Sequence, residues 1–286
     1  DDVKVTNNTF TSMQNLGANS RVIQIGSATN FVVSNNVIED ATQSYAFDFG
    51  GASRGVCVGN VIKNCRSIID LEGGASDITF TGNVCISTSS NWGNGFYLLE
   101  NGSGDTSDRV TISGNIITGF LNGIRIEGGR EITIAGNTVS ECRQAGISVV
   151  DGFLSSKVTD NLTVTGNSVN NCSKAGAGVY SGIAIKADRG IISGNFVRGT
   201  NHLSDITTNA ANTLTQVGLN YAGSVVRGES STYVTFSNRR IYETSSNPEG
   251  FISANTGDLC LRSTGGSATT LYVKESGTSN TGWIGK

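Results

Sequence analysis

Four carboxylates occupy matching positions in a repeated sequence pattern, and together they could cleave a glycosidic bond. Asp48 and Asp70 fall in successive repeats. Glu72 follows Asp70 by two residues, and Glu127 lies two repeats further along. Paired carboxylates can supply the general acid and the base or nucleophile of glycoside hydrolysis, and crowding raises the pKa of one of them so that it keeps its proton at neutral pH. The candidate catalytic residues are therefore Asp48, Asp70, Glu72 and Glu127.

Cationic and aromatic side chains accompany these carboxylates. Arg125 could hold an acidic sugar, and Arg125 or Lys186 beside a carboxylate could instead act as the base of a polysaccharide lyase. Trp92 and Tyr180 lie in two insertions. Loops on a rigid scaffold concentrate binding residues, and exposed aromatic rings offer flat apolar surface to sugars. The expected substrate-binding residues are Arg125, Tyr97, Glu100, Trp92, Tyr180 and Lys186.

A short sequence motif, which recurs eight times, determines where these residues lie in the fold. In each copy an apolar/polar alternation leads to an asparagine, and a second alternation follows, as in Val110-Thr111-Ile112-Ser113-Gly114-Asn115-Ile116. Successive copies are about 22 to 32 residues apart, a spacing typical of a stacked repeat fold. In the second to eighth copies the asparagines are Asn36, Asn60, Asn83, Asn115, Asn137, Asn167 and Asn195.

The motif predicts an all-β fold. Alternation indicates half-buried strands, and asparagine suits the tight bend between them. Three short strands and three bends make one coil, so we predict a right-handed parallel β-helix of about eight coils, stacked about 4.8 Å apart. The asparagines would form a buried amide ladder. A leucine-rich repeat is the alternative at this period, but its leucine spacing and helical segment are absent.

In this fold, one strand of each coil points a column of side chains outward. Adjacent coils would hold Asp48 and Asp70 about 5 Å apart, which suits a retaining glycosidase. Glu72 and Glu127 would be about 10 Å apart, which approaches an inverting pair. The alternative, that these are solvated charges on an exposed sheet, stays open. The predicted column is Gln24, Asp48, Asp70, Tyr97, Arg125, Ser148 and Ala184.

The composition of the chain limits the classes of partner that it could bind. The formal net charge is −3, so there is no electrostatic case for binding nucleic acid or an anionic membrane. No apolar run reaches the length of a membrane span, and no signal peptide opens the chain. His202 is the only histidine and the six cysteines do not cluster with it, so we expect no metal and no cofactor. The cysteines fit a core column, with a Cys142–Cys172 disulfide as the less favoured alternative.

The repeat continues to about Gly199. We therefore predict a β-helix over residues 1–199, a connecting segment rich in Ser, Thr and Asn over 200–217, and a C-terminal β region over 218–286. Because the chain opens inside a repeat without a capping element, we expect it to be a fragment of a longer protein.

The closing segment resembles the C-terminal tails of bacteriophage tail-fibre and tailspike proteins. It reads Leu271-Tyr272-Val273-Lys274-Glu275-Ser276-Gly277-Thr278, followed by Gly282-Trp283. The repeats before it are similar to the pectin-lyase-like body that tailspikes share with polysaccharide lyases and hydrolases. The resemblance implies a homotrimer in the virion tail whose three chains are joined by the C-terminal region. It also implies action at the host cell surface on a bacterial capsule or O-antigen polysaccharide.

Three functions remain under consideration. We favour a polysaccharide depolymerase that works by glycoside hydrolysis. A polysaccharide lyase on the same face is the second, and a non-enzymatic receptor-binding or structural spike is the third. Reducing ends, unsaturated uronate, or binding without product would distinguish them.

Overall fold

A computed structural model of the chain shows two compact units. The first comprises Asp1–Thr215 with Leu219–Ser231, and the second comprises Gln216–Gly218 with Thr232–Lys286. The structure describes residues 2–13, 20–88, 93–100, 103–152, 157–208, 216–218, 220–222, 225–226, 235–236, 239–267 and 269–286.

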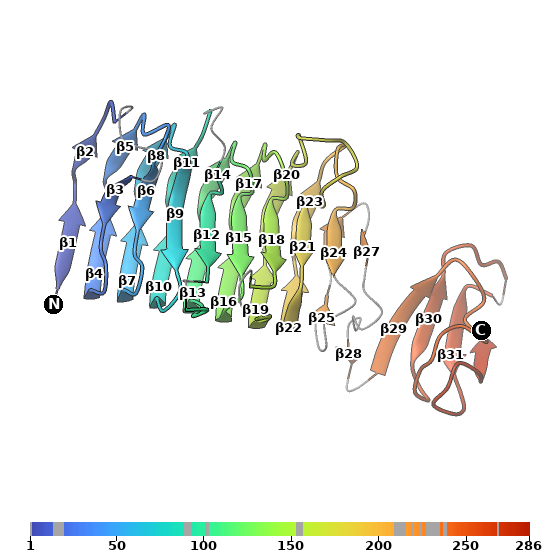
Figure 1. Cartoon of the computed structure of the whole chain (residues 1–286). Helices are drawn as coiled ribbons and strands as arrows, with labels where there is room; N and C mark the ends of the chain where they lie inside the picture. The colour runs from blue at the N-terminus through green and yellow to red at the C-terminus, as the bar shows by residue number, and fades with distance from the viewer. Residues whose placement is uncertain are drawn as a thin grey trace. The chain divides into compact units, whose positions relative to one another are not determined.

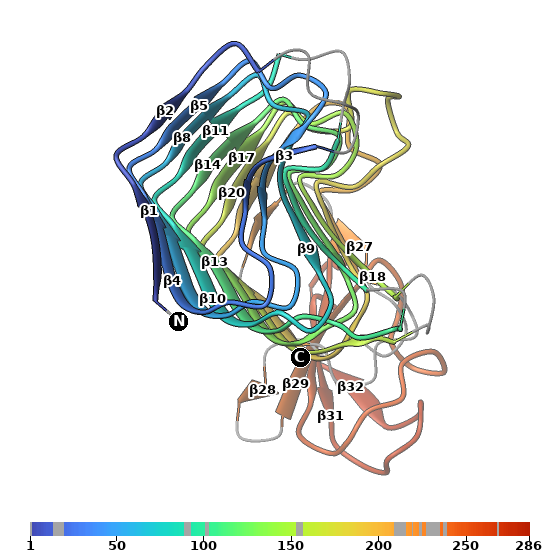
Figure 2. The same cartoon turned by 60° about the vertical axis from the view of Figure 1, so that its left-hand side comes forward.

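Three parallel sheets wind around the first unit, one strand of each per coil, as Figure 1 shows. Sheet A consists of β1 (Val3–Thr6), β4 (Thr29–Ser34), β7 (Ser53–Val58), β10 (Ser76–Thr81), β13 (Asp108–Ser113), β16 (Arg130–Ala135), β19 (Thr159–Thr165), β22 (Ala187–Ser193) and β25 (Gln216–Val217). Sheet B consists of β2 (Thr9–Phe10), β5 (Val37–Glu39), β8 (Val61–Lys63), β11 (Val84–Ile86), β14 (Ile116–Thr118), β17 (Thr138–Ser140), β20 (Ser168–Asn170), β23 (Phe196–Arg198) and β26 (Tyr221–Ala222). Sheet C consists of β3 (Arg21–Gln24), β6 (Tyr45–Asp48), β9 (Ser67–Glu72), β12 (Phe96–Leu99), β15 (Ile124–Glu127), β18 (Ile147–Val150), β21 (Ile183–Ile185), β24 (Ile206–Thr208) and β27 (Val225–Val226). Figure 2 looks more nearly along the stack and shows sheets B and C on different sides of the coil.

The predicted amide ladder is confirmed at the bend between sheets A and B. Each asparagine donates from Nδ2 to the Oδ1 of the next coil's asparagine, at 2.9–3.0 Å, from Asn8 through to Asn220. The same Oδ1 also accepts the backbone N–H of the preceding asparagine, as between Asn83 and Asn115. Asn115 is 1% exposed. Burying these polar groups is tolerated because every donor and acceptor along the row is matched.

Aromatic rings fill the core of the early coils. Phe31 contacts Phe49 with ring centroids 4.7 Å apart, Phe49 stacks on Phe80 at 6.1 Å, and Phe80 meets Phe96 edge-on at 5.4 Å. Gly55, opposite Phe31 in sheet A, makes room for this stack, because an added Cβ would lie 2.0 Å from the Phe31 ring. The ring stack therefore fixes the position of the strands that carry the outward residues.

The sheets continue beyond Gly199, where we had expected a connecting segment. β24 pairs in parallel with β21, and β26 pairs with β23. Asn220 extends the ladder by one more rung through its bond to Asn195. The sequence hides this coil because residues 200–217 are rich in Ser, Thr and Asn, so the alternation between apolar and polar residues is weak there.

The second unit contains a small mixed sheet of β28 (Thr235–Phe236), β29 (Arg239–Thr244), β30 (Leu259–Arg262), β31 (Leu271–Lys274) and β32 (Trp283–Gly285). The residues of the C-terminal motif form its last two strands: β31 and β32 pair antiparallel, with Lys274 opposite Trp283. Trp283 packs with Tyr272 and Cys260, and its Nε1 donates to the Ile252 carbonyl at 2.8 Å. The motif thus supplies Tyr272 and Trp283 to the core of this unit.

Two sequence expectations concern cysteines and membranes. All six cysteines are buried and free, so the Cys142–Cys172 disulfide is not formed in this structure. In the part of the chain that the structure describes, no helix is long and apolar enough to cross a membrane.

Candidate functional site

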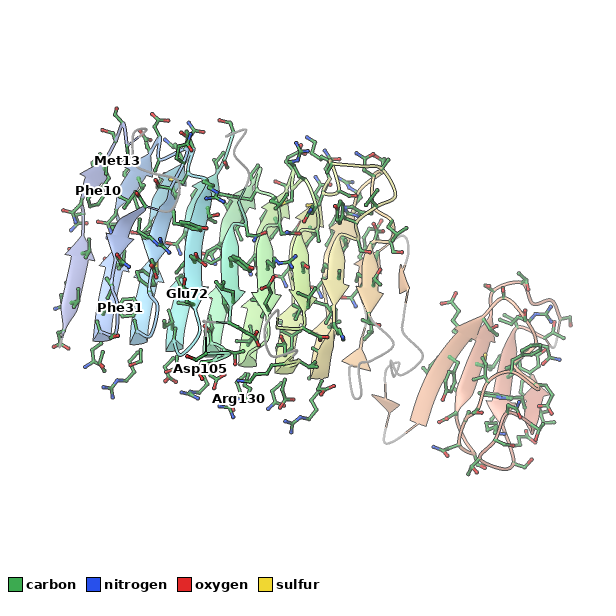
Figure 3. All side chains as sticks on the ribbon, viewed as in Figure 1. Phe10, Met13, Phe31, Glu72, Asp105 and Arg130 are labelled. Atoms are coloured by element: carbon green, nitrogen blue, oxygen red, sulfur yellow. The ribbon has the colours of Figure 1, made fainter. Side chains whose placement is uncertain are left out.

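The outer face of sheet C carries the predicted column of side chains. Strand pairing aligns Gln24 with Asp48, Asp48 with Asp70, and Asp70 with Tyr97. The column continues through Arg125, Ser148 and Ala184. Residues distant in the sequence therefore become neighbours, as the repeat pattern predicted. Figure 3 shows Glu72 on β9 of this sheet.

Asp48 is held by one ion pair and two hydrogen bonds. Its Oδ2 lies 3.0 Å from Arg21 Nε and accepts a hydrogen bond from Gln24 Nε2 at 3.1 Å. Its Oδ1 accepts the backbone N–H of Gly50 at 3.0 Å. The side chain is almost fully buried. These contacts fix the orientation of the Asp48 side chain.

Asp70 has a different environment although it lies one coil away. It is 7% exposed, and among the described residues its Oδ1 has no hydrogen-bond partner. Burial, then the nearby Glu72 and Asp48 carboxylates, raise the pKa of Asp70 to about 6, although Arg21 and Arg66 oppose the shift. Asp70 can therefore hold a proton at a pH where an ordinary aspartate has lost it.

Glu72 is the exposed member of this group, which we call the Asp70 cluster (Asp48, Asp70 and Glu72). Its neighbour across the sheet is Gly50, where an added Cβ would lie 3.4 Å from Asp48 Oδ1 and 3.8 Å from Glu72 Cβ. Gly26 precedes Gly50 in the same outward position, and an added Cβ there would meet only the Gly50 carbonyl oxygen, at 4.0 Å. Because neither glycine has a side chain, the surface beside the carboxylates is unobstructed at these two positions, and a sugar ring could approach it there.

Arg21, Tyr45 and Arg66 surround this cluster and were not predicted as site residues. Arg21 and Tyr45 are paired across β3 and β6. The guanidinium carbons of Arg21 and Arg66 lie 5.3 Å and 5.6 Å from the centre of the Tyr45 ring. Burial, then Asp70, raise the pKa of Tyr45, while the two arginines oppose the rise. The pairing of Arg21 with Tyr45 follows from strand register, but the direction of the two guanidinium groups over the ring does not.

Arg125 and Glu127 form a second group with Tyr97, further along the column. Arg125 donates from Nε to Glu127 Oε1 at 2.8 Å, and its Nη2 lies 2.8 Å from the same oxygen. Burial, followed by the charge of Glu127, raises the pKa of Tyr97. Arg125 is thus engaged by a carboxylate of its own strand. Glu127 is almost fully buried and lies apart from Asp48 and Asp70, with β12 between β9 and β15.

The remaining predicted binding residues are dispersed. Lys186 forms an ion pair with Asp151. Glu100 is buried against Gly152, where an added Cβ would lie 2.0 Å from Glu100 Oε1. Tyr180 accepts a hydrogen bond from Gln144 Nε2 at 3.2 Å in the connection between sheets B and C. Trp92 lies outside the described residues.

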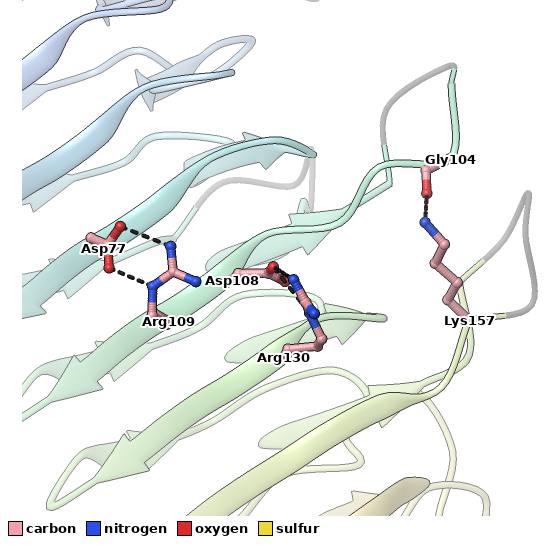
Figure 4. Close-up of polar contacts among 6 residues, drawn as sticks. All are labelled: Asp77, Gly104, Asp108, Arg109, Arg130 and Lys157. Carbon is pink, nitrogen blue, oxygen red and sulfur yellow. Dashed lines mark hydrogen bonds and ion pairs between the residues drawn. The ribbon is translucent and has the colours of Figure 1, made fainter.

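Charged pairs also link coils at the edge where sheet C turns into sheet A, as Figure 4 shows. Arg109 binds Asp77 at 2.6 Å, and Arg130 binds Asp108 at 2.5 Å. A hollow of about 660 Å³ opens at this edge, lined by Gly74, Asp105, Thr106, Asp108, Gly129, Arg130, Lys157, Val158, Asp160 and Asp188. No cluster of three or more metal-ligating side chains occurs among the described residues.

Comparisons with known proteins identify the fold. A family model described as "Right handed beta helix region" matches residues 93–215. The fold is a right-handed parallel β-helix. No curated protein sequence matches the chain.

Solved structures show the same architecture at low sequence identity. The A-module of mannuronan C-5 epimerase AlgE6 from Azotobacter vinelandii is 14% identical, with a TM-score of 0.55 over 74% of this chain and 61% of that one. DFA-IIIase from Arthrobacter chlorophenolicus A6, without its lid and in complex with GF2, is 13% identical, with a TM-score of 0.52 over 72% of this chain and 54% of that one. The chain thus spans less than two thirds of these structures. At such identity the likeness shows the fold alone.

Proposed function

We propose that this chain hydrolyses a polysaccharide at the outer face of sheet C, with Asp70 as the general acid. The observation that supports this most strongly is the raised pKa of a buried carboxyl, about 6, beside the exposed carboxylate of Glu72. A general acid works best when its pKa lies near the operating pH. The fold is compatible with such a substrate, since the similar epimerase module is named for mannuronan.

Two carboxylates of β9 would divide the reaction. Asp70 gives its proton to the glycosidic oxygen as the bond from that oxygen to the anomeric carbon breaks. Glu72 takes a proton from a water molecule, whose oxygen attacks the anomeric carbon from the opposite side of the sugar. Asp70 and Glu72 are two residues apart on an extended strand, so their side chains point to the same side and would leave room for a water molecule between the carboxyl groups, as inversion requires. We therefore expect inversion, with Asp48 holding Arg21 in place rather than attacking the sugar.

Polysaccharide lysis is the second candidate, and the cations around Tyr45 favour it. A lyase needs a base to take the proton next to a uronate carboxylate and a cation to neutralise that carboxylate. Tyr45 has two guanidinium groups within 6 Å of its ring centre. The products separate the two reactions, because only elimination creates an unsaturated uronate that absorbs in the ultraviolet.

We also propose that the chain belongs to a phage tailspike. The support is the tail-like motif that forms β31 and β32 in the second unit. In this proposal the chain assembles as a homotrimer in the virion tail, residues of the second unit join the three copies, and the substrate is a capsule or O-antigen of the host cell surface. A non-enzymatic receptor-binding spike is the alternative. Light scattering of the full chain should give three times the chain mass, and a monomer at micromolar concentration would refute the assembly.

The catalytic proposal is tested with a panel of bacterial surface polysaccharides. Reducing ends should appear with the wild-type chain and be lost, by at least about 100-fold, in Asp70→Asn and Glu72→Gln. Glu39→Gln is the matched control, because Glu39 is a partly exposed carboxylate of sheet B paired with Lys63. If both sheet C variants keep full activity, the assigned acid and base are wrong. If all variants bind and none produces ends, the chain is a binder.

A further inference from the structure

Two aromatic rings stand together on the outside of sheet B, far from the Asp70 cluster. Phe196 and Tyr221 are paired in register on β23 and β26. Their ring centroids are 4.7 Å apart and the rings are nearly parallel, at 2°. Phe196 is 38% exposed and Tyr221 is 69% exposed. The two preceding residues of the same outward row, Thr138 and Ser168, are small, so the aromatic surface is local to these two strands.

A basic side chain adjoins the rings. The guanidinium carbon of Arg198 lies 5.8 Å from the centre of the Phe196 ring. Among the described residues, no carboxylate pairs with Arg198. Ser140 and Asn170, which precede Arg198 in the same row of sheet B, are uncharged. A planar guanidinium in this position can bind a carboxylate through two parallel hydrogen bonds.

Tyr221 and Arg198 line a hollow of about 680 Å³, within the size range of small-molecule sites. Gly199 contributes to its floor without a side chain, because an added Cβ would lie 2.7 Å from His202 Nε2. His202 is in turn fixed by Asp205, with Nδ1 and Oδ1 2.9 Å apart. The hollow is lined by Asn170, Asn171, Val197, Arg198, Gly199, Thr200, Asp205, Tyr221 and Ala222. It thus combines an exposed aromatic ring, the Arg198 cation, short polar side chains and the Asp205 carboxylate, which His202 holds.

We propose that this hollow is a second carbohydrate-binding site, specific for a sugar that carries a carboxylate. The C–H face of a pyranose packs on Tyr221, which Phe196 supports from one side. Arg198 binds the sugar carboxylate, and Asn170 and Thr200 reach its hydroxyls. The charge of Arg198 selects a uronate over a neutral hexose of the same shape.

The site lies on a different sheet and about five coils from β9, which corresponds to about 24 Å along the stack. A long polymer could occupy both places, and the second contact then raises its local concentration at the first. Short oligosaccharides cannot span the two. The inference does not depend on cleavage, because binding is measured directly.

The test is calorimetric titration of the full chain with an oligohexuronate and with a neutral oligohexose of equal length. We expect the uronate to bind, and to bind equally well to Glu39→Gln, which lies on a distant coil of the same sheet. Tyr221→Ala should weaken uronate binding by about tenfold. Tyr221→Phe should weaken it little, because the aromatic ring remains. Arg198→Ala should weaken the uronate by about tenfold while leaving any neutral binding unchanged.

Ile116→Ala is the matched control, because Ile116 is 44% exposed in the same outward row of sheet B. Circular dichroism verifies that each variant stays folded. Absence of uronate binding, or binding that survives both Tyr221→Ala and Arg198→Ala, overturns the proposal. Equal binding of the neutral sugar overturns the assigned specificity.

Discussion

Replacing Asp70 by asparagine should stabilise the protein at neutral pH while abolishing its activity. The folded pKa of Asp70 is about 6, against an ordinary value of 3.8. The folded state thus binds the proton more tightly than the unfolded state does. The stabilising effect of that proton is complete below pH 4 and is lost as the pH rises through about 6.

The size of the effect follows from the shift. A difference of about two pKa units corresponds to about 3 kcal/mol, which the charged Asp70 costs the folded state above pH 6. Asparagine has nearly the same shape and no charge, so Asp70→Asn should recover part of this, roughly 1–3 kcal/mol. For a chain of this size the melting temperature should rise by roughly 5 °C at pH 8. At pH 4 or below, wild type and variant should melt together.

Thermal unfolding followed by circular dichroism between pH 4 and pH 8 measures this difference. Asp48→Asn is the opposing control. Asp48 forms an ion pair with Arg21 and accepts hydrogen bonds from Gln24 and the Gly50 N–H, so its replacement should lower the melting temperature at neutral pH. Equal melting temperatures of wild type and Asp70→Asn at pH 8, or a gain that persists unchanged at pH 4, would refute the assignment of a buried protonated carboxyl.

Further predictions concern the reaction, the ladder and the thiols. The turnover rate should fall as the pH rises above about 6, because Asp70 loses the proton it must donate; a rate that is flat to pH 8 contradicts this. Asn115→Ala should cost roughly 2–4 kcal/mol, because it leaves buried partners unsatisfied on both neighbouring coils, whereas the exposed-row variant Thr111→Ala should cost under about 1 kcal/mol. The six cysteines are buried, and burial raises the pKa of Cys65 to about 12, so a thiol reagent should label none until the chain unfolds; rapid labelling of the native protein would disprove it.

The sequence predicts the architecture better than the chemistry. The asparagine spacing defines the coil, and period-two alternation then aligns Asp48 with Asp70 and Arg125. The interaction of Arg125 with Glu127 was also accessible, since residues two apart on a strand point to the same side. By contrast, the placement of the Arg21 and Arg66 guanidinium groups beside Tyr45 depends on side-chain directions that strand register alone does not give. Neither was evident in a linear pattern, nor was the extra coil after Gly199.

The ordered separation of inward and outward positions has a consequence for how such a surface can change. Each outward residue of sheet C has neighbours on its own coil and on the coils before and after it, while the amide row and the ring stack lie on the other side of the backbone. An outward substitution can therefore alter what the surface recognises without loosening the interior. Adding or removing one whole coil would shift groups on either side of it by about 4.8 Å. The spacing between recognition groups on this scaffold can thus change in steps of one coil.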